Sequence, residues 1–228
     1  MSELFSIQLQ NRQQQGRDGV WLDLPTTTEQ VQAALRQIGI SSDNPQGLFI
    51  SGYFAEEEKR FAIPYNMVLA SNVDELNFLA SRLETLSTGE RAELNAALQA
   101  PQSELFSIGR ITDFPENVDY YVHLPDVHGP AQLGDYYLNR SGMVDMPEEW
   151  KGGIDTAQFG RYVAQQEQGA FTQYGYLVKS GDEWQKVHEG QPVPEEYRVL
   201  SFPAPEVLRD AANIPPPVQP ETEPQKVI

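Results

Sequence analysis

The chain has 228 residues, and its 33 Asp and Glu against 16 Lys and Arg give a formal net charge of -17. This excess of negative charge repels nucleic acid and anionic membrane surfaces, so a basic partner is the natural expectation. The absence of Cys excludes disulfides, thiolate catalysis and thiolate metal sites.

The N-terminal residues carry an acid and lack the basic stretch that precedes the apolar run of a signal peptide. No run in the sequence reaches the roughly 18 apolar residues that a membrane span needs. We therefore expect a soluble cytoplasmic protein without membrane contact.

Residues 1–62 combine strand and helix patterns. Apolar and polar residues alternate over 3–8 and 19–24, which predicts two paired strands. Val31, Leu35 and Ile38 then recur at helical spacing before a glycine, a residue that commonly ends helices. With a third strand predicted over 47–54, this stretch should form a small sheet with one helix packed on it.

Residues 63–101 have helical periodicity throughout. Ser71 with Asp74, and Ser87 with Glu90, have the spacing of a capping box, in which each side chain accepts a hydrogen bond from the backbone N–H of the other residue. Two amphipathic helices are therefore predicted, one beginning at each serine.

Residues 102–180 return to a mixed pattern, with strands predicted over 104–111, 118–124 and 169–178 and helices over 130–140 and 155–166. The hexapeptide of residues 2–7 recurs at 103–108. Because the match does not extend further, two strands of similar composition explain it better than an internal duplication.

Residues 181–228 are not predicted to form a further sheet or helical unit. A hairpin is predicted from strands over 184–188 and 197–202, with Trp184, Tyr197 and Phe202 capping the sheet of 102–180. Seven of the 17 Pro lie between Pro203 and Pro224, so residues 203–228 are predicted to be mostly disordered, apart from a marginal helix over 205–212.

The expected fold class is therefore α+β. We predict an elongated chain of three small units, an α+β sheet unit (1–62), a helical unit (63–101) and a second α+β sheet unit (102–180). An extension hairpin (181–202) and a Pro-rich tail (203–228) follow.

Motifs for catalysis are weak. The sequence has no Gly-x-Ser-x-Gly elbow and no Gly-rich phosphate loop. His123, Asp126 and His128 lie close together, but a polar surface loop explains this spacing better than a metal site. We expect no enzymatic activity, no metal and no cofactor. A hydrolase with two catalytic carboxylates stays open as a minor alternative, because 33 acids make any chosen pair uninformative.

The acids are most concentrated between residues 113 and 155, where nine acids stand against Arg140 and Lys151, a net charge of -7. The ordinary interpretation is that such acids keep a protein soluble. The alternative is that they imitate the phosphates of duplex DNA, whose charges recur about every 1.7 Å of helix axis. The nine acids are Asp113, Glu116, Asp119, Asp126, Asp135, Asp145, Glu148, Glu149 and Asp155.

Four collinear stretches between residues 4 and 178 resemble the ArdA antirestriction family. They are Gly19-Val20-Trp21-Leu22-Asp23-Leu24-Pro25, Asp74-Glu75-Leu76-Asn77-Phe78-Leu79, Leu133-Gly134-Asp135-Tyr136-Tyr137-Leu138 and Phe159-Gly160-Arg161-Tyr162. The resemblance implies an elongated protein of three units, usually a dimer. It also implies mimicry of bent B-form DNA and occupation of the DNA-binding groove of type I restriction-modification enzymes.

One departure concerns the end of the helix that carries the Tyr-Tyr pair. Relatives often place acids before the glycine that follows, whereas this chain has Asn139 and Arg140. This difference weakens the expected mimicry at that point.

We therefore predict an antirestriction protein that acts by competition and makes or breaks no bond. The predicted phosphate mimics are the nine acids above and a second cluster, Glu56, Glu57 and Glu58. A homodimer is expected through residues of about 101–180. The alternative is an acidic adaptor that binds another basic protein of a mobile genetic element through the residues after 180, without DNA mimicry.

Overall fold

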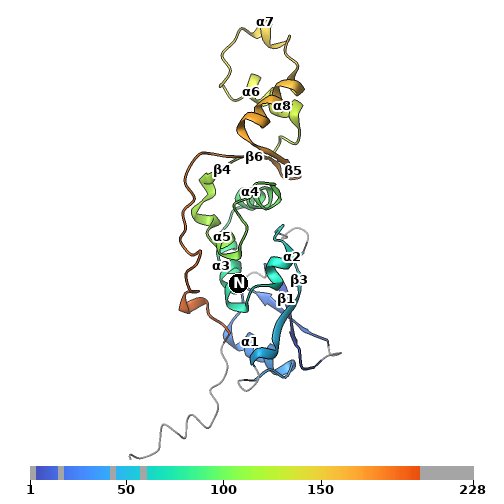
Figure 1. Cartoon of the computed structure of the whole chain (residues 1–228), viewed down its shortest axis with the longest axis vertical. Helices are drawn as coiled ribbons and strands as arrows, with labels where there is room; N and C mark the ends of the chain where they lie inside the picture. The colour runs from blue at the N-terminus through green and yellow to red at the C-terminus, as the bar shows by residue number, and fades with distance from the viewer. Residues whose placement is uncertain (1–3, 15–17, 42–44, 57–60, 201–228) are drawn as a thin grey trace, which may run out of the picture.

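The structure, a computed structural model, describes residues 4–14, 18–41, 45–56 and 61–200. The predictions for Phe202, for the helix over 205–212 and for the Pro-rich tail lie outside these ranges. The molecule is elongated, with a sheet at one end, helices in the middle, and a second sheet followed by a helical tip at the other end (Figure 1). The α+β class and the elongated form expected from the sequence are confirmed.

The first sheet, sheet A, consists of β1 (Phe5–Asn11), β2 (Val20–Leu24) and β3 (Leu48–Phe54) in the antiparallel order β2-β1-β3. Alternate residues of β1 are buried, as its alternating sequence predicts. The helix α1 (Thr28–Gln37) covers the buried face with Val31 and Leu35. A short 3-10 turn, η1 (Pro45–Gly47), precedes β3.

Three helices, α2 (Tyr65–Leu69), α3 (Val73–Leu83) and α4 (Thr88–Gln99), form the middle of the molecule. The predicted capping box of Ser87 and Glu90 opens α4. The predicted box at Ser71 is wrong by one residue, because Asn72 and Glu75 cap α3. The Ser71 hydroxyl instead donates to the Met67 carbonyl of α2 at 2.8 Å.

The strand predicted over 104–111 is wrong, because α5 (Ile108–Thr112) begins inside it. In the first copy of the repeated hexapeptide, Ser6 donates to Asp23 of the neighbouring strand at 2.5 Å. In the second copy, Ser107 accepts the Arg110 backbone N–H at 3.2 Å and caps α5. Serine can serve either structure, and the neighbouring chain decides which one forms.

After α5 the chain forms the 3-10 turns η3 (Phe114–Glu116) and η4 (Val118–Tyr120) and then β4 (Tyr121–Leu124), so the strand predicted over 118–124 begins at residue 121. The strand predicted over 169–178 is a hairpin of β5 (Ala170–Thr172) and β6 (Gly175–Lys179). Gly175 permits the turn with a φ of 118°. These strands form sheet B in the antiparallel order β4-β6-β5.

The tip of the molecule consists of α6 (Pro130–Asn139), α7 (Glu148–Lys151) and α8 (Thr156–Glu167) (Figure 1). A hydrophobic core extends from sheet A through α3 and α4 to one side of sheet B, and a second, smaller core lies between sheet B and the tip. The division into units at residues 62 and 101 stays a prediction.

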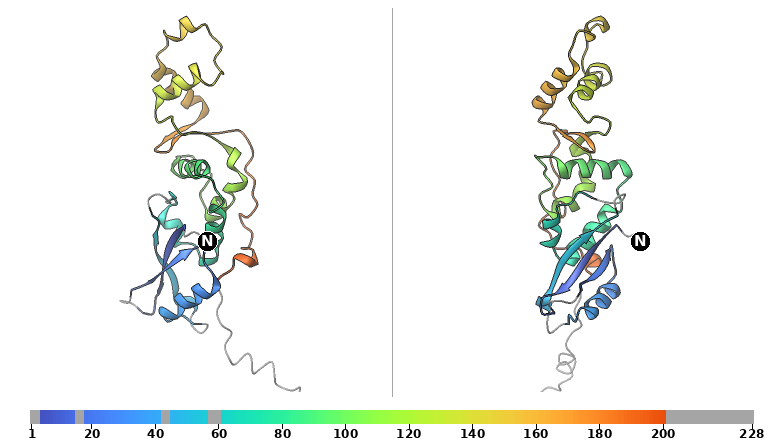
Figure 2. Two further views of the ribbon diagram at one scale, coloured as in Figure 1. Left: turned by 180° about the vertical axis from the view of Figure 1, so that it is seen from behind. Right: turned by 90° about the vertical axis from the view of Figure 1, so that its right-hand side faces the viewer.

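The hairpin predicted over 184–202 is wrong, because residues 181–200 contain no strand. This segment, which we call the strap, leaves β6 and runs back beside α5 and α3 toward sheet A, with one 3-10 turn, η5 (Glu195–Tyr197) (Figures 1 and 2). Trp184 packs against Tyr120 beside sheet B, as expected for a cap of that sheet, but Tyr197 packs against Phe78 of α3. The strap backbone makes hydrogen bonds with side chains of other elements, where a strand would make them with a neighbouring strand.

Candidate partner-binding surface

Four of the predicted phosphate mimics are exposed, and the described part of the chain offers them no ion-pair partner. Two of them lie beside sheet B and two lie at the tip, around α7. Asp119 lies in η4, Asp126 in the turn after β4, Asp145 before α7 and Glu149 within α7. Their carboxylates face water with their charge uncompensated.

Three other predicted mimics, Glu116, Asp135 and Glu148, pair with cations. Glu116 forms an ion pair with Arg82 of α3. Asp135 accepts hydrogen bonds from the Arg140 guanidinium at 2.9 Å and from the Asn139 amide at 2.8 Å. Both residues that depart from the family pattern therefore bind the same carboxylate. The charge that Asp135 presents to a partner is reduced as a result.

Glu148 of α7 also pairs with a cation, the Lys151 ammonium, at 2.6 Å, although its side chain remains 82% exposed. Asp155 caps α8 by accepting the Gln158 backbone N–H at 2.9 Å and stays exposed. Both carboxylates are still accessible to a partner.

The second predicted cluster is described only in part. Glu56 follows β3 and is exposed. Glu57 and Glu58 lie outside the described residues, so their grouping with Glu56 stays a prediction.

The prediction that Asp113 belongs to the exposed acidic surface is wrong. Its side chain is fully buried, with an exposed fraction of 0%. The carboxylate accepts the backbone N–H groups of Val187, His188 and Glu189 at 3.3, 2.6 and 3.1 Å. A buried carboxylate needs such donors, because an ionised group that loses water without replacement is strongly destabilising. Asp113 is therefore an internal anchor and cannot stand in for a phosphate.

Glu93 of α4 is an unusual acid that the sequence did not single out. Burial, followed by repulsion from Glu90 and Asp119, raises the pKa of Glu93 to about 8. Its Oε1 atom is buried without a hydrogen-bond partner among the described residues. This carboxyl therefore holds its proton near neutral pH and adds no full negative charge to the surface.

The predicted loop placement is wrong for His123, which lies in β4, whereas Asp126 and His128 follow the strand. The Nε2 atom of His123 lies 2.7 Å from the Tyr174 carbonyl oxygen, which holds the ring against the hairpin of sheet B. Within the described ranges, no three His, Asp or Glu side chains are grouped so that they could hold a metal ion. No helix in those ranges is long and apolar enough to cross a membrane.

Large apolar side chains are exposed at the tip. Met143, Trp150 and Tyr162 have exposed fractions of 75%, 68% and 60%. They belong to the loop after α6, to α7 and to α8. Exposed apolar groups of this size are typical of protein contact surfaces.

The fold and the surface together define an acidic, elongated protein with exposed carboxylates. The family model described as "Antirestriction protein (ArdA)" matches residues 15–178. The chain therefore belongs to the ArdA antirestriction family, and its function is antirestriction, the inhibition of restriction enzymes. No match was found among curated proteins. The strap lies beyond the matched residues.

Proposed function

We propose that the protein mimics B-form DNA and competitively occupies the DNA-binding groove of type I restriction-modification enzymes. The observation that carries this proposal is the presence of exposed carboxylates after β3, beside sheet B and at the tip of an elongated member of an antirestriction family. DNA-binding grooves are lined by Lys and Arg that contact phosphates, and carboxylates offer these cations the same charge.

Competition follows from electrostatics alone. The net charge of -17 attracts a basic groove over a distance, which raises the rate of encounter. Once bound, the carboxylates occupy the cations that DNA would use. The protein acts in stoichiometric amounts as a competitor and not as an enzyme.

The proposed mimic surface is smaller than the set predicted from the sequence. Asp113 is left out because it is buried, and Glu116 and Asp135 contribute less because cations already neutralise them. The carboxylates that we propose as mimics are those of Glu56, Asp119, Asp126, Asp145, Glu148, Glu149 and Asp155.

We also propose that the protein acts as a homodimer through residues of about 101–180. The exposed apolar side chains Met143, Trp150 and Tyr162 support a contact at the tip. Such a contact would place two acidic bodies end to end and lengthen the surface presented to the enzyme.

The experiment that tests the main proposal is direct binding. The purified protein should bind a type I enzyme in the absence of DNA, and duplex DNA should compete for the same site. Binding that duplex DNA does not displace would contradict mimicry. An absence of binding to any type I enzyme tested, with tight binding to another basic protein of a mobile element, would favour the adaptor alternative.

A further inference from the structure

The strap is anchored in its first half by two buried side chains. Besides the three N–H groups bound by Asp113, the Asn117 side chain accepts the Gln185 N–H at 2.7 Å and donates to the Gln185 carbonyl at 3.0 Å. Both anchors are almost inaccessible, with exposed fractions of 0% for Asp113 and 4% for Asn117. This half of the strap is therefore an integral part of the packing around α5 and η3.

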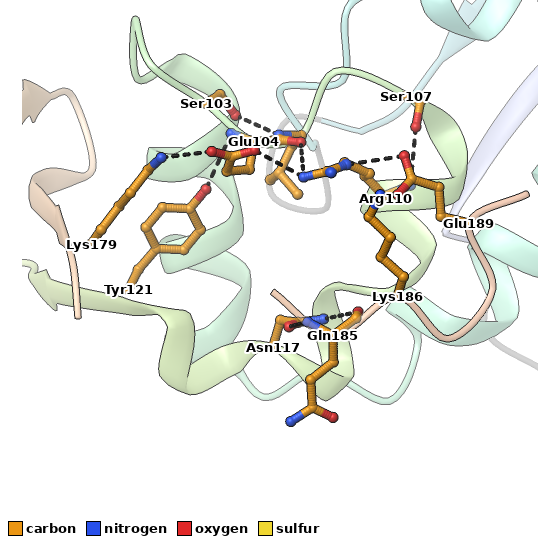
Figure 3. A network of polar contacts seen from close by, with 11 residues as sticks. Ser103, Glu104, Ser107, Arg110, Asn117, Tyr121, Lys179, Gln185, Lys186 and Glu189 are labelled. Atoms are coloured by element: carbon orange, nitrogen blue, oxygen red, sulfur yellow. Dashed lines mark hydrogen bonds and ion pairs between the residues drawn. The ribbon is translucent and has the colours of Figure 1, made fainter. Parts of the chain in front are cut away.

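A polar network ties the same half to α5 and to sheet B (Figure 3). The Arg110 guanidinium of α5 donates to Glu189 of the strap at 3.0 Å and to Glu104 at 2.9 Å. Glu104 in turn accepts a hydrogen bond from Lys179 of β6 at 2.6 Å. Because Arg110 is only 8% exposed, these carboxylates compensate a nearly buried charge.

The second half of the strap is anchored near sheet A. The Asp74 carboxylate of α3 accepts the backbone N–H groups of Val199 and Leu200 at 2.8 and 2.7 Å. The Asn77 amide donates to the Tyr197 carbonyl at 3.1 Å. The strap is therefore bound at both ends of the helical middle of the molecule.

One of these anchors also reaches sheet A. The Asn77 side-chain oxygen accepts the backbone N–H of Thr26, which lies between β2 and α1, at 2.7 Å. The same amide therefore joins the strap and the sheet A unit to α3.

We infer that the strap, residues 181–200, is a brace that fixes the orientation of sheet B and the tip relative to sheet A. It leaves β6, binds α5 and η3 in its first half, and ends on α3 beside Thr26. A chain tied down at both ends limits rocking between the parts that it connects. The polar anchors bind backbone groups and Glu189 of the strap, and Trp184, His188 and Tyr197 add aromatic contacts with Tyr120 and Phe78.

The benefit that we assign to the brace rests on the proposed function. Duplex DNA is stiff over the length of this protein, with a persistence length of about 50 nm. A competitor whose ends rocked would lose more conformational entropy on binding the enzyme, and its affinity would fall. A brace keeps the carboxylates of the tip in a fixed relation to those nearer sheet A.

The rival explanation is that the hydrophobic core alone sets this orientation, and cutting the strap after folding distinguishes the two. A site-specific protease sequence inserted between Gln191 and Pro192, both exposed, lies between the two groups of anchors. The protein folds with an intact strap and is cut afterwards, so a failure to fold is not confused with the effect. The control carries the same insertion between Gly152 and Gly153 at the tip, where both residues are exposed.

The readout is the distance between two spin labels, because a chain without Cys can be labelled selectively at introduced cysteines. Arg36→Cys in α1 and Gln165→Cys in α8 place labels at exposed positions near the two ends. Pulsed electron paramagnetic resonance should give a narrow distance distribution before cleavage and a clearly broader one after the strap is cut. Cutting the control loop should leave the distribution narrow.

An unchanged distribution after complete cleavage of the strap would overturn the brace, as would equal broadening in the control. Cutting the strap should also weaken binding to a type I enzyme, on the order of tenfold. The free protein is then more mobile, so it loses more conformational entropy when it binds. If the uncut protein binds no type I enzyme, the proposed function fails, while the spin-label distances still decide the inference about the brace.

Discussion

Gly134 of α6 and Gly160 of α8 meet where the two helices of the tip cross. A Cβ atom added at Gly134 would overlap the Thr156 carbonyl oxygen, and one added at Gly160 would overlap the Pro130 carbonyl oxygen. The two backbones therefore touch without any side chain between them. Both glycines belong to stretches that carry the family resemblance, and this close approach is a physical reason for glycine at each position.

The first prediction concerns this crossing. Gly134→Ala and Gly160→Ala should each lower the free energy of unfolding by about 1 to 3 kcal/mol, because overpacking outweighs the better helix propensity of alanine. Urea denaturation followed by circular dichroism measures the change. Gly152→Ala is the matched control, since a Cβ there meets no atom within 4 Å. Equal stability of Gly134→Ala and this control would contradict the close packing.

The sequence predicted the elements whose signals are local. Alternation in β1 and β2, helical spacing in α1 and the serine cap of α4 all lie within a few residues of one another. Prediction from the sequence failed where contacts between distant residues determine the secondary structure. Residues 104–111 alternate as a strand does, yet the Ser107 cap and packing against α3 give a helix. The strap has strand-like segments, but its hydrogen-bond partners lie more than 60 residues away in the sequence.

The candidate surface was predictable in composition but not in exposure. A count of acids treats Asp113 and Asp126 alike, although the first is buried beneath the strap and the second faces water. Asp113 is buried because it binds the backbone N–H groups of residues 187–189, and no sequence pattern near Asp113 predicts these contacts. Likewise, the raised pKa of Glu93 depends first on burial, which is set by the tertiary fold.

The second prediction concerns Asp113. Asp113→Ala should lower the free energy of unfolding by roughly 3 kcal/mol, because three backbone N–H groups of the strap lose their acceptor. Asp126→Ala, which removes an exposed carboxylate, should change it by no more than about 0.5 kcal/mol. Chemical denaturation of both variants measures this difference. Amide hydrogen exchange at residues 187–189 should also accelerate in Asp113→Ala, and unchanged exchange there would contradict the anchoring role.

The third prediction concerns pH and Glu93. Its pKa rises from an ordinary 4.5 to about 8 in the folded protein, so the folded state binds the proton more tightly than the unfolded state. Between these two pH values the contribution of Glu93 to stability therefore falls as pH rises, and it levels off above about pH 8. Glu93→Gln should remove this dependence, so its stability relative to the parent should increase across this range.

Unfolding midpoints of Glu93→Gln measured across this pH range test the sign of the effect. Glu149→Gln, a change at an exposed site of the tip, serves as the control and should follow the parent protein in parallel. A constant difference between Glu93→Gln and the parent at every pH would contradict the raised pKa.

The fourth prediction concerns assembly. Sedimentation equilibrium at micromolar concentration should give about twice the chain mass of 25.6 kDa. Trp150→Ala should shift the protein toward the monomer, because a large exposed indole at the centre of a contact contributes strongly to binding. Trp21→Ala, which removes a 49% exposed indole from sheet A at the opposite end, should leave the dimer intact. A dimer lost only in the Trp21 variant would move the contact to sheet A.

The last prediction concerns the mimic surface, and it uses the difference between unpaired and paired carboxylates. Replacing Asp119, Asp126, Asp145 and Glu149 by Asn or Gln in growing sets should weaken direct binding to a type I enzyme stepwise, by at most about fivefold for each pair lost. Glu116→Gln and Asp135→Asn should have smaller effects, because Arg82 and Arg140 already pair with these acids.

The binding of the parent protein should weaken as salt rises, since the Debye length shrinks from about 10 Å at 0.1 M to about 3 Å at 1 M. Each set of replacements should make this salt dependence shallower, because fewer charges then take part in binding. Binding is measured without DNA, whose own contacts with the enzyme are also sensitive to salt. Loss of all binding after a single replacement, with the fold intact, would indicate one localised site, and unchanged binding after all four would remove these carboxylates from the proposed contact.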